Sequence, residues 1–283
     1  MDYREGKWAQ QIISQQNSDG TWGRNFHSLS QPSNRYPLTT EQALRRLLAL
    51  GFTANDAPIR KTLDCLTSCL MGERKIDDYW EKTHDWQLFT QLMLSAWIRV
   101  FEPENAVALS FAKRWANVIG ASFAEGCFKH EAYLAAYQTE FAPNPKGARE
   151  IDPTALYHLL LLPGVLPREV EALYLDHVIN KADGIYYVYS KLIAEPPGCF
   201  QTKQASWYCA ALETLARYDL AREQLGFAID WLKANQDSDT QWDFSSKASD
   251  GVYFPLSDSW RTAEDRRLDC TNRVRALLED LGE

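Results

Sequence analysis

Two acidic residues near the C-terminus have the spacing that acid–base chemistry requires. Asp265 and Asp269 are one helical turn apart in a segment typical of a helix, so both side chains lie on one face. Paired carboxylates in different surroundings can act as general acid and general base. Arg266 and Arg273 are within reach of them. The alternative interpretation is structural, an ion-pair network that closes the last helical hairpin against the first.

A histidine beside an acidic residue is the second candidate for chemistry. His130 and Glu131 begin a helical stretch that also carries Tyr133 and Tyr137. Because histidine titrates near neutral pH, His130 inside a cavity would suit a general base. A solvated helix start is the competing interpretation, and the sequence leaves both open.

Aromatic and cationic residues form a third group, which points to ligand binding. The chain contains 10 Trp, 13 Tyr and 12 Phe residues. Such side chains fill large cores, and they also line pockets for apolar, planar or sugar ligands. The predicted ligand-binding residues are Trp97, Tyr133, Tyr137, Trp207, Tyr208, Trp260, Arg261 and Arg266.

Composition and missing motifs narrow the function. The net charge of −8 disfavours a nucleic-acid partner, because phosphate binding requires a dense cationic surface. The sequence shows neither the apolar core of a signal peptide nor a run as long as a bilayer span, so we expect a cytoplasmic protein without a membrane segment. The six cysteines lack a zinc-ligand pattern, and we expect buried thiols, no metal and no cofactor. No serine-nucleophile elbow, phosphate-binding glycine loop or dinucleotide fingerprint occurs.

The elements that must position these residues are helices, since almost no strand-like alternation occurs. Turn clusters, N-caps and glycine stops mark their ends. We expect helices at residues 2–16, 40–50, 56–71, 84–101, 104–121, 128–141, 152–162, 167–180, 203–217, 219–235 and 262–281.

A turn motif recurs between these helices. It consists of a polar, an acidic and an aromatic residue at three-residue steps, and its aromatic side chain is expected to plug the seam between hairpins. The acidic residue is expected to accept backbone N–H groups at the next helix start. The five copies are Gln16/Asp19/Trp22, Arg74/Asp77/Trp80, Ser122/Glu125/Phe128, Asn180/Asp183/Tyr186 and Gln236/Asp239/Trp242.

Successive helices are of two kinds. Those at 56–71 and 219–235 mix apolar and charged residues, which indicates half-exposed surfaces. The helix at 84–101 and the runs 132–137 and 205–212 are apolar nearly all round, so they must be covered on every side. An inner ring of buried helices within an outer ring satisfies both. The sequence therefore predicts an all-α fold of helical hairpins in two concentric rings, forming one domain over residues 1–283.

The first turn resembles a known repeat. The run from Gln16 to Gly23 is similar to the Q-x-x-D-G-x-W motif of the terpenoid cyclases and protein prenyltransferases, and Gln236/Asp239/Trp242 repeats its spacing. The resemblance implies an (α/α)6 toroid with a central cavity. The catalytic motifs of that superfamily do not transfer. The string from Asp237 to Thr240 lacks the last acid of D-x-D-D, and Gln204 and Ser206 stand where a zinc prenyltransferase has metal ligands.

Three functions stay open. The first is a toroid whose aromatic cavity holds an apolar or isoprenoid-like molecule, and the resemblance favours it. The second is a carbohydrate-active (α/α)6 barrel, which requires two facing carboxylates about 5–10 Å apart. The third is a non-catalytic scaffold for a protein partner, with an exposed apolar patch and a filled centre. Whether the chain is an enzyme is left open.

Overall fold

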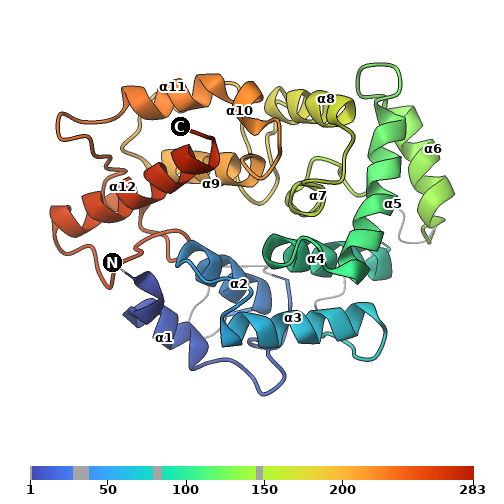
Figure 1. Ribbon diagram of the computed structural model, residues 1–283, viewed down its shortest axis with the longest axis horizontal. Coiled ribbons are helices and arrows are strands. Elements are labelled where there is room, and N and C mark those ends of the chain that lie inside the picture. Colours follow the sequence, from blue (N-terminus) through green and yellow to red (C-terminus); the bar gives the residue numbers. More distant parts are fainter. Residues whose placement is uncertain (1, 28–37, 79–84, 145–148) are drawn as a thin grey trace.

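The computed structural model describes residues 2–27, 38–78, 85–144 and 149–283 (Figure 1). These residues form twelve α-helices and no β-sheet, which confirms the predicted all-α fold. Among them, no helix has the length and apolar character that crossing a bilayer requires. One of the five predicted turn aromatics, Trp80, lies outside the described residues.

Most helices correspond to the predicted ranges, but the predicted helix at 219–235 is divided at Leu225, and the one at 2–16 consists of a short 3-10 helix (Tyr3–Glu5) and α1. In chain order they are α1 (Lys7–Ile13), α2 (Thr40–Ala49), α3 (Ala57–Leu70), α4 (Trp86–Phe101), α5 (Ala106–Ser122), α6 (His130–Phe141), α7 (Leu156–Leu161), α8 (Arg168–Ile179), α9 (Lys203–Leu215), α10 (Ala221–Gln224), α11 (Gly226–Ala234) and α12 (Ala263–Asp280).

Local sequence signals fix the start of the helices that surround the centre. Thr39 caps α2 by accepting a hydrogen bond from the backbone N–H of Gln42, and the Gln42 side chain accepts one from Thr39 in return. This reciprocal capping satisfies two N–H groups that the helix itself leaves unpaired. Thr262 and Thr202 cap α12 and α9 through their hydroxyl oxygens.

The helices are arranged in an inner and an outer set. Helices α2, α4, α7, α9 and α12 lie toward the middle of the molecule, and α1, α3, α5, α8 and α11 lie outside them (Figure 1). The first and last segments of the chain meet, because Asn272 of α12 donates a hydrogen bond to the Tyr3 hydroxyl (2.7 Å) and Lys7 N–H donates one to Asp258 (2.7 Å). A closed toroid of six hairpins stays a prediction, since α6 does not follow the alternation.

Helix α6 departs from its predicted burial. The run 132–137 was expected to be covered on all sides, but Leu134 and Ala135 are exposed. Only Tyr133 and Tyr137 of α6 are buried, and α6 packs on the outside of α5. Three of the six residues in this run are alanines, whose small side chains lose little when they face water, so the apolar character of the run alone did not indicate an inner position.

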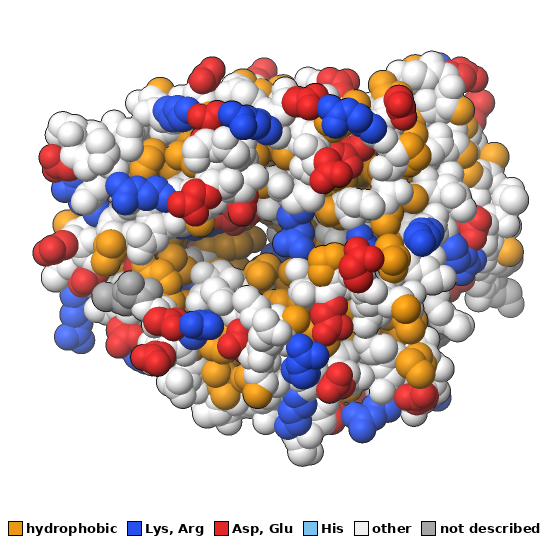
Figure 2. All heavy atoms as spheres, in the orientation of Figure 1, with side chains coloured by type: hydrophobic (Ala, Val, Ile, Leu, Met, Phe, Trp, Pro, Cys, Tyr) orange, Lys and Arg blue, Asp and Glu red, His pale blue; other side chains and the backbone are white. Residues whose placement is uncertain are grey.

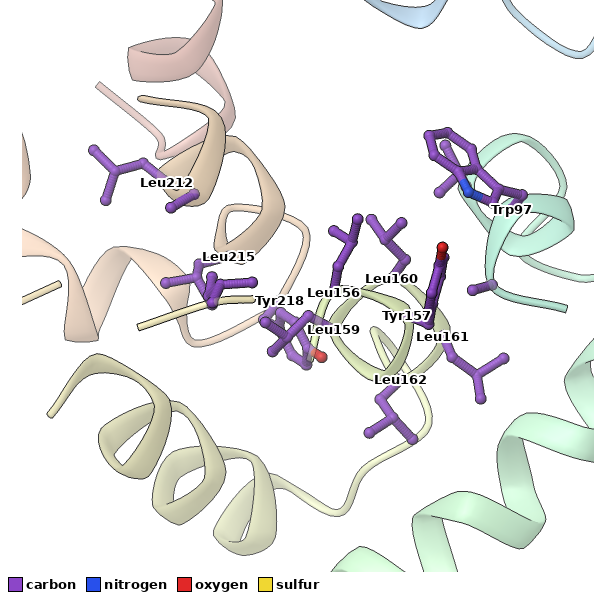
Figure 3. Close-up of a cluster of buried hydrophobic side chains, with 14 of the residues drawn as sticks. Trp97, Leu156, Tyr157, Leu159, Leu160, Leu161, Leu162, Leu212, Leu215 and Tyr218 are labelled. Atoms are coloured by element: carbon purple, nitrogen blue, oxygen red, sulfur yellow. The ribbon is translucent and has the colours of Figure 1, made fainter. Parts of the chain in front are cut away.

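Helix α7 occupies a central position and has no polar face. Every residue from Leu156 to Leu161 is buried. Figure 3 shows these side chains pointing outward in all directions around the helix, with Trp97 of α4 on one side and Leu215 of α9 on the other. A short helix of this kind is stable only when its neighbours cover it completely, and α4, α9 and the segments beside them do so.

Two of the recurring turns have the same structure. Trp22 Nε1 donates to the carbonyl of Ile12 and Trp242 Nε1 to that of Leu232, both at 2.7 Å and both ten residues back along the chain. Both indoles are buried. In each turn the tryptophan backbone N–H also donates to a threonine hydroxyl of the following inner helix, Thr40 (3.0 Å) or Thr271 (3.1 Å). The predicted role of these two tryptophans as plugs is consistent with this burial.

The position after the acidic residue of the turn is Gly20 in the first copy and Thr240 in the last, and the surroundings of Gly20 explain the difference. Gly20 has φ of +94°, and a Cβ there would meet the carbonyl oxygen of Lys61 at 2.5 Å. At the matching place in the other copy, Thr240 also has a positive φ (58°). The backbone of the turn is therefore kept although the residue changes, and only the copy that lies against α3 requires glycine.

Other details of the motif differ from expectation. Tyr186 is 58% exposed, so the copy at Asn180/Asp183/Tyr186 does not use its aromatic residue as a plug. The acidic residues do not share one role either, since Asp19 accepts from the backbone N–H and hydroxyl of Thr21 within the turn, whereas the Asp239 carboxylate lies 3.5 Å from Arg267 of α12. Spacing alone did not distinguish a buried indole from an exposed phenol ring.

The two turn aromatics provide a matched test of this distinction. We expect Trp242→Ala to lower the free energy of unfolding by about 3–5 kcal/mol, because it removes a large buried side chain and one of the two donors to the Leu232 carbonyl. Tyr186→Ala should change it by no more than about 0.5 kcal/mol. Urea denaturation followed by circular dichroism measures both, and equal losses would contradict the interpretation.

His158 is buried on the side of α7 that faces α5. Its ring meets the Trp115 ring edge-on at 4.3 Å between centroids, and neither of its nitrogens has a hydrogen-bond partner among the described residues. Burial therefore lowers the pKa of His158 to about 4.

This histidine should make stability depend on pH. In the unfolded chain a histidine titrates near 6.5, so below that pH the unfolded state binds a proton that the folded state does not. Stability is then complete above about pH 6.5 and falls as the pH decreases toward 4. Between pH 7.5 and 4.5 we expect His158→Phe to lose about 2–3 kcal/mol less than the wild type, measured by urea denaturation. Parallel pH curves for the two proteins would count against the buried neutral ring.

A candidate ligand pocket between the inner helices

A pocket of about 420 Å³ lies between the five inner helices. Figure 2 shows the face of the molecule hollowed near its centre, with apolar side chains inside and a cationic side chain at the edge. Apolar side chains make up most of the lining. They are Leu48, Ala49, Leu50, Trp97, Leu156, Leu160, Val188, Ala210, Leu256, Ala276 and Leu277. The charged residues of the lining are Arg45, Glu213, Arg217, Arg273 and Asp280.

The side of the pocket formed by α9 and α12 carries a bidentate ion pair. Arg273 Nε and Nη2 donate to the two carboxylate oxygens of Glu213 at 2.6 and 3.0 Å. Arg273 Nη1 donates to the Ser206 hydroxyl (2.8 Å), and the guanidinium lies 4.7 Å from the ring of Tyr253. Burial alone would lower the pKa of Arg273, but the Glu213 carboxylate raises it above its ordinary value. This pair is therefore ionised and fixed in place.

A buried carboxylate, that of Glu41, supports the opposite wall. Glu41 of α2 pairs with Arg45 one turn along the helix (3.0 Å), and it accepts hydrogen bonds from the Tyr157 hydroxyl (3.0 Å) and from Trp97 Nε1 (3.4 Å). These bonds connect α2, α4 and α7. Burial, together with the nearby Glu41 charge, raises the pKa of Tyr157 well above its ordinary value, so the phenol stays a donor. The network holds the Trp97 indole against the pocket.

Arg217 is the cation of the lining whose donors are least satisfied. Its Nη2 donates to the Val100 carbonyl at the end of α4 (2.8 Å), while its buried Nε has no hydrogen-bond partner among the described residues. Burial lowers the pKa of Arg217 from its ordinary value, and the charge of Asp280 partly opposes this effect. The guanidinium belongs to the pocket lining, but the buried Nε itself is not open to the space of the pocket.

The predicted acid–base pair lies outside this pocket. Asp269 is buried and its Oδ2 accepts four hydrogen bonds, from Leu256 N, Ser257 N and Oγ, and Trp260 Nε1, at 2.7–2.8 Å. It therefore anchors the loop before α12. Asp265 belongs to the N-cap of α12, where it exchanges hydrogen bonds with Thr262.

The arginines near this pair bind other carboxylates. Arg266 makes a bidentate ion pair with Asp243 (2.7 and 2.8 Å), whereas Arg273 pairs with Glu213. Arg261 is exposed. The structure therefore does not bring Asp265, Asp269 and their expected cations together in one cavity, although the N- and C-terminal segments do meet beside them.

The second predicted group is also separate from the pocket. His130 and Glu131 are exposed, and His130 Nε2 lies 3.4 Å from a Glu150 carboxylate oxygen. Tyr133 donates to the Ile151 carbonyl, and Tyr137 stacks on Trp115 with ring centroids 5.6 Å apart. Both rings belong to the packing between α5 and α6.

Of the eight predicted ligand-binding residues, Trp97 belongs to the described lining of the pocket and the other seven do not. Tyr208 is buried and donates to the Ile193 carbonyl (3.0 Å). Trp207 is exposed beside Asp250, and Trp260 donates to Asp269. Sequence reasoning missed Arg45, Glu213 and Arg217. A charged residue in a largely apolar stretch, such as Glu213 directly after the apolar run 205–212, is the signal that could have found them.

The described residues contain no group of three or more His, Cys, Asp or Glu side chains arranged to hold a metal ion. The chemistry available in the pocket is therefore that of guanidinium groups, carboxylates, hydroxyls and apolar side chains. Such a set binds and orients a ligand with an apolar part and a charged part.

The contribution of the Arg273–Glu213 ion pair to stability can be measured against that of a surface ion pair, Arg168–Glu223. We expect Glu213→Gln to lower the free energy of unfolding by about 2–4 kcal/mol, because a buried guanidinium loses its counter-charge. Glu223 pairs with Arg168 at 2.7 Å, but both side chains are about two-thirds exposed. Glu223→Gln should therefore cost less than about 1 kcal/mol in the same denaturation assay. Similar costs for the two variants would show that the pocket pair is as weak as a surface pair.

Comparison with known proteins leaves the fold and the pocket as the basis for functional inference. Neither a scan against protein-family models nor searches of curated proteins and of solved structures found a match. The resemblance to the terpenoid cyclases and protein prenyltransferases thus rests on the turn motif alone. What this chain binds has to be argued from its own residues.

Proposed function

We propose that the pocket between the inner helices binds a small amphipathic molecule with an isoprenoid-like apolar body and one anionic head group. The observation that supports the proposal most directly is the Arg217 guanidinium, which lies in the lining of a mostly apolar cavity and donates to a backbone carbonyl rather than to a carboxylate. Charge-assisted hydrogen bonds from arginine to carboxylate or phosphate oxygens are strong and directional. No reaction forms part of the proposal.

The distribution of charge favours an anion rather than a cation as the head group. Arg273 and Glu213 neutralise each other, and Arg45 is neutralised by Glu41, which lies just behind the lining. Arg217 and Asp280 remain at the rim, and Asp280 is exposed to solvent. The more buried of these two charges is therefore positive, and a ligand anion would relieve its desolvation.

The size and lining of the pocket suit such a ligand. Its volume of about 420 Å³ falls within the usual range of small-molecule sites, about 300–1,000 Å³. Leu156 and Leu160 of α7 and Leu48 of α2 supply apolar surface for the body of the ligand. The turn motif, similar to that of proteins that act on isoprenoids, adds to this support.

The carbohydrate-active alternative has less support. It requires two carboxylates that can divide acid and base roles, and the lining offers Glu213 and Asp280. Glu213 already accepts two hydrogen bonds from Arg273, which occupy both of its carboxylate oxygens. The pocket lining is also mostly apolar, whereas sugars require many hydrogen-bonding partners. The alternative of a non-catalytic protein scaffold requires a filled centre, whereas a pocket of about 420 Å³ lies between the inner helices.

Calorimetric titration with three probes tests the proposal. Farnesyl diphosphate carries both parts of the expected ligand, farnesol carries the apolar part, and inorganic diphosphate carries the charge. We expect farnesyl diphosphate to bind at least about tenfold more tightly than farnesol, since a hydrogen bond to a charged group contributes about 1.5–3 kcal/mol. Arg217→Gln should remove most of this difference while leaving farnesol binding unchanged. The absence of binding by all three probes would overturn the proposal.

Two tryptophan substitutions on α12 locate the binding site. Ala276 lines the pocket and is exposed, so Ala276→Trp places a large side chain in the cavity without crowding the core. It should abolish binding. Glu279 lies on the same helix, is exposed and does not belong to the lining, and Glu279→Trp should bind as the wild type does. Equal binding by both variants would place the ligand elsewhere.

A further inference from the structure

A second, polar pocket contains a pair of cysteines that the proposed function does not use. It has a volume of about 510 Å³ and lies between the first turn, α3 and the segment that follows α3. It shares no lining residue with the pocket between the inner helices. Its polar and charged lining includes Asp19, Arg24, Cys65, Arg74, Lys75 and Asp77.

Cys65 and Cys69 lie one turn apart on the same face of α3, and Cys65 lines the pocket. Cys65 keeps 6% of its surface exposed, Cys69 is half-buried, and neither is in a disulfide. The Cys69 thiol and, more weakly, the Arg74 guanidinium stabilise the Cys65 thiolate against the effect of burial, and together they lower the pKa of Cys65 to about 6. The pKa of the Cys69 thiol is raised, so Cys69 stays protonated beside it.

We propose that Cys65 is a thiol-modification site, at which the thiolate forms a mixed disulfide with a small zwitterionic peptide disulfide of the glutathione type. The pocket supplies groups that complement such a molecule. Arg24, Arg74 and Lys75 can pair with its carboxylates, and Asp19 and Asp77 with its ammonium group. Neither a long apolar ligand nor a polyanion fits a lining in which both signs of charge alternate.

The chemical step is a thiol–disulfide exchange. The Cys65 thiolate attacks one sulfur of the peptide disulfide, the Cys65–peptide S–S bond forms, and the S–S bond of the reagent breaks. The second half of the reagent leaves as a thiolate, which takes a proton from solvent. The reagent is the oxidant, so no further electron acceptor is needed.

The helix geometry predicts that the reaction stops at this mixed disulfide. Displacement by Cys69 would require a bond between residues at positions i and i+4 of α3, whose Cβ atoms lie about 5–6 Å apart. A disulfide requires about 3.5–4.5 Å between Cβ atoms. An internal Cys65–Cys69 disulfide would therefore require α3 to unwind, and Cys69 acts as a positioning residue for the thiolate rather than as a second nucleophile.

Incubation of the whole protein with oxidised glutathione, followed by peptide mass spectrometry, tests the inference. A short peptide with one cysteine, modified in the same tube, serves as the reference. Because an ordinary cysteine titrates near pH 8.5, the rate of modification of the peptide should rise steadily from pH 6 to 8.5, whereas the rate at Cys65 should level off above about pH 7. Identical pH profiles for the peptide and for Cys65, or modification of Cys65 only in urea, would overturn the inference.

Three variants separate the stated roles from a structural effect. Arg74→Gln and Cys69→Ala should each shift the plateau for Cys65 to higher pH, because each removes a group that stabilises the thiolate. Arg60 lies on α3 and does not line the pocket, so Arg60→Gln should leave the profile unchanged. If Arg60→Gln moves the plateau as Arg74→Gln does, a general charge effect replaces the proposed site. A Cys65–Cys69 disulfide as the main product would also contradict it.

Discussion

The rest of the structure depends on covering inner helices that have no polar face. Helix α7 is the extreme case, because each of its residues is buried and its side chains point in every direction (Figure 3). Water cannot cover any side of such a helix without exposing leucine or tyrosine surface, at about 25 cal/mol per Å². Helices α4 and α9 therefore pack against it, and they in turn require covering by outer helices. The buried tryptophans of the turns join outer to inner helices, Trp22 between α1 and α2 and Trp242 between α11 and α12.

Packing apolar helices around a centre leaves a few polar groups with no access to water. The structure pairs them across helices. Glu41 connects α2 to α4 and α7 through Trp97 and Tyr157, and Arg273 connects α12 to α9 through Glu213. Each connection specifies which helices are neighbours, because a mispaired carboxylate or guanidinium in this region would be buried without a counter-charge.

The pocket follows from the same arrangement. Between α2, α7, α9 and α12 the lining contains small or exposed residues such as Ala49, Ala210 and Ala276, and the helices do not close the space completely. Arg217 is tied to the end of α4 by its bond to the Val100 carbonyl. The packing that stabilises the inner helices thus also leaves a pocket with largely apolar walls and charged groups in its lining.

The sequence by itself determined the helical class, most helix positions and the two tryptophan turns, because these depend on residues that are close along the chain. Thr39 and Gln42 cap α2 locally, and the turn at Asp19 closes on itself. Only the tertiary structure decided which polar residues line the pocket. Asp269 and Glu213 look equally suited to chemistry in the sequence, but Asp269 is surrounded by donors of its own loop while Glu213 meets Arg273 from another helix. These partners are brought together by packing over long sequence separations, and no local pattern encodes that.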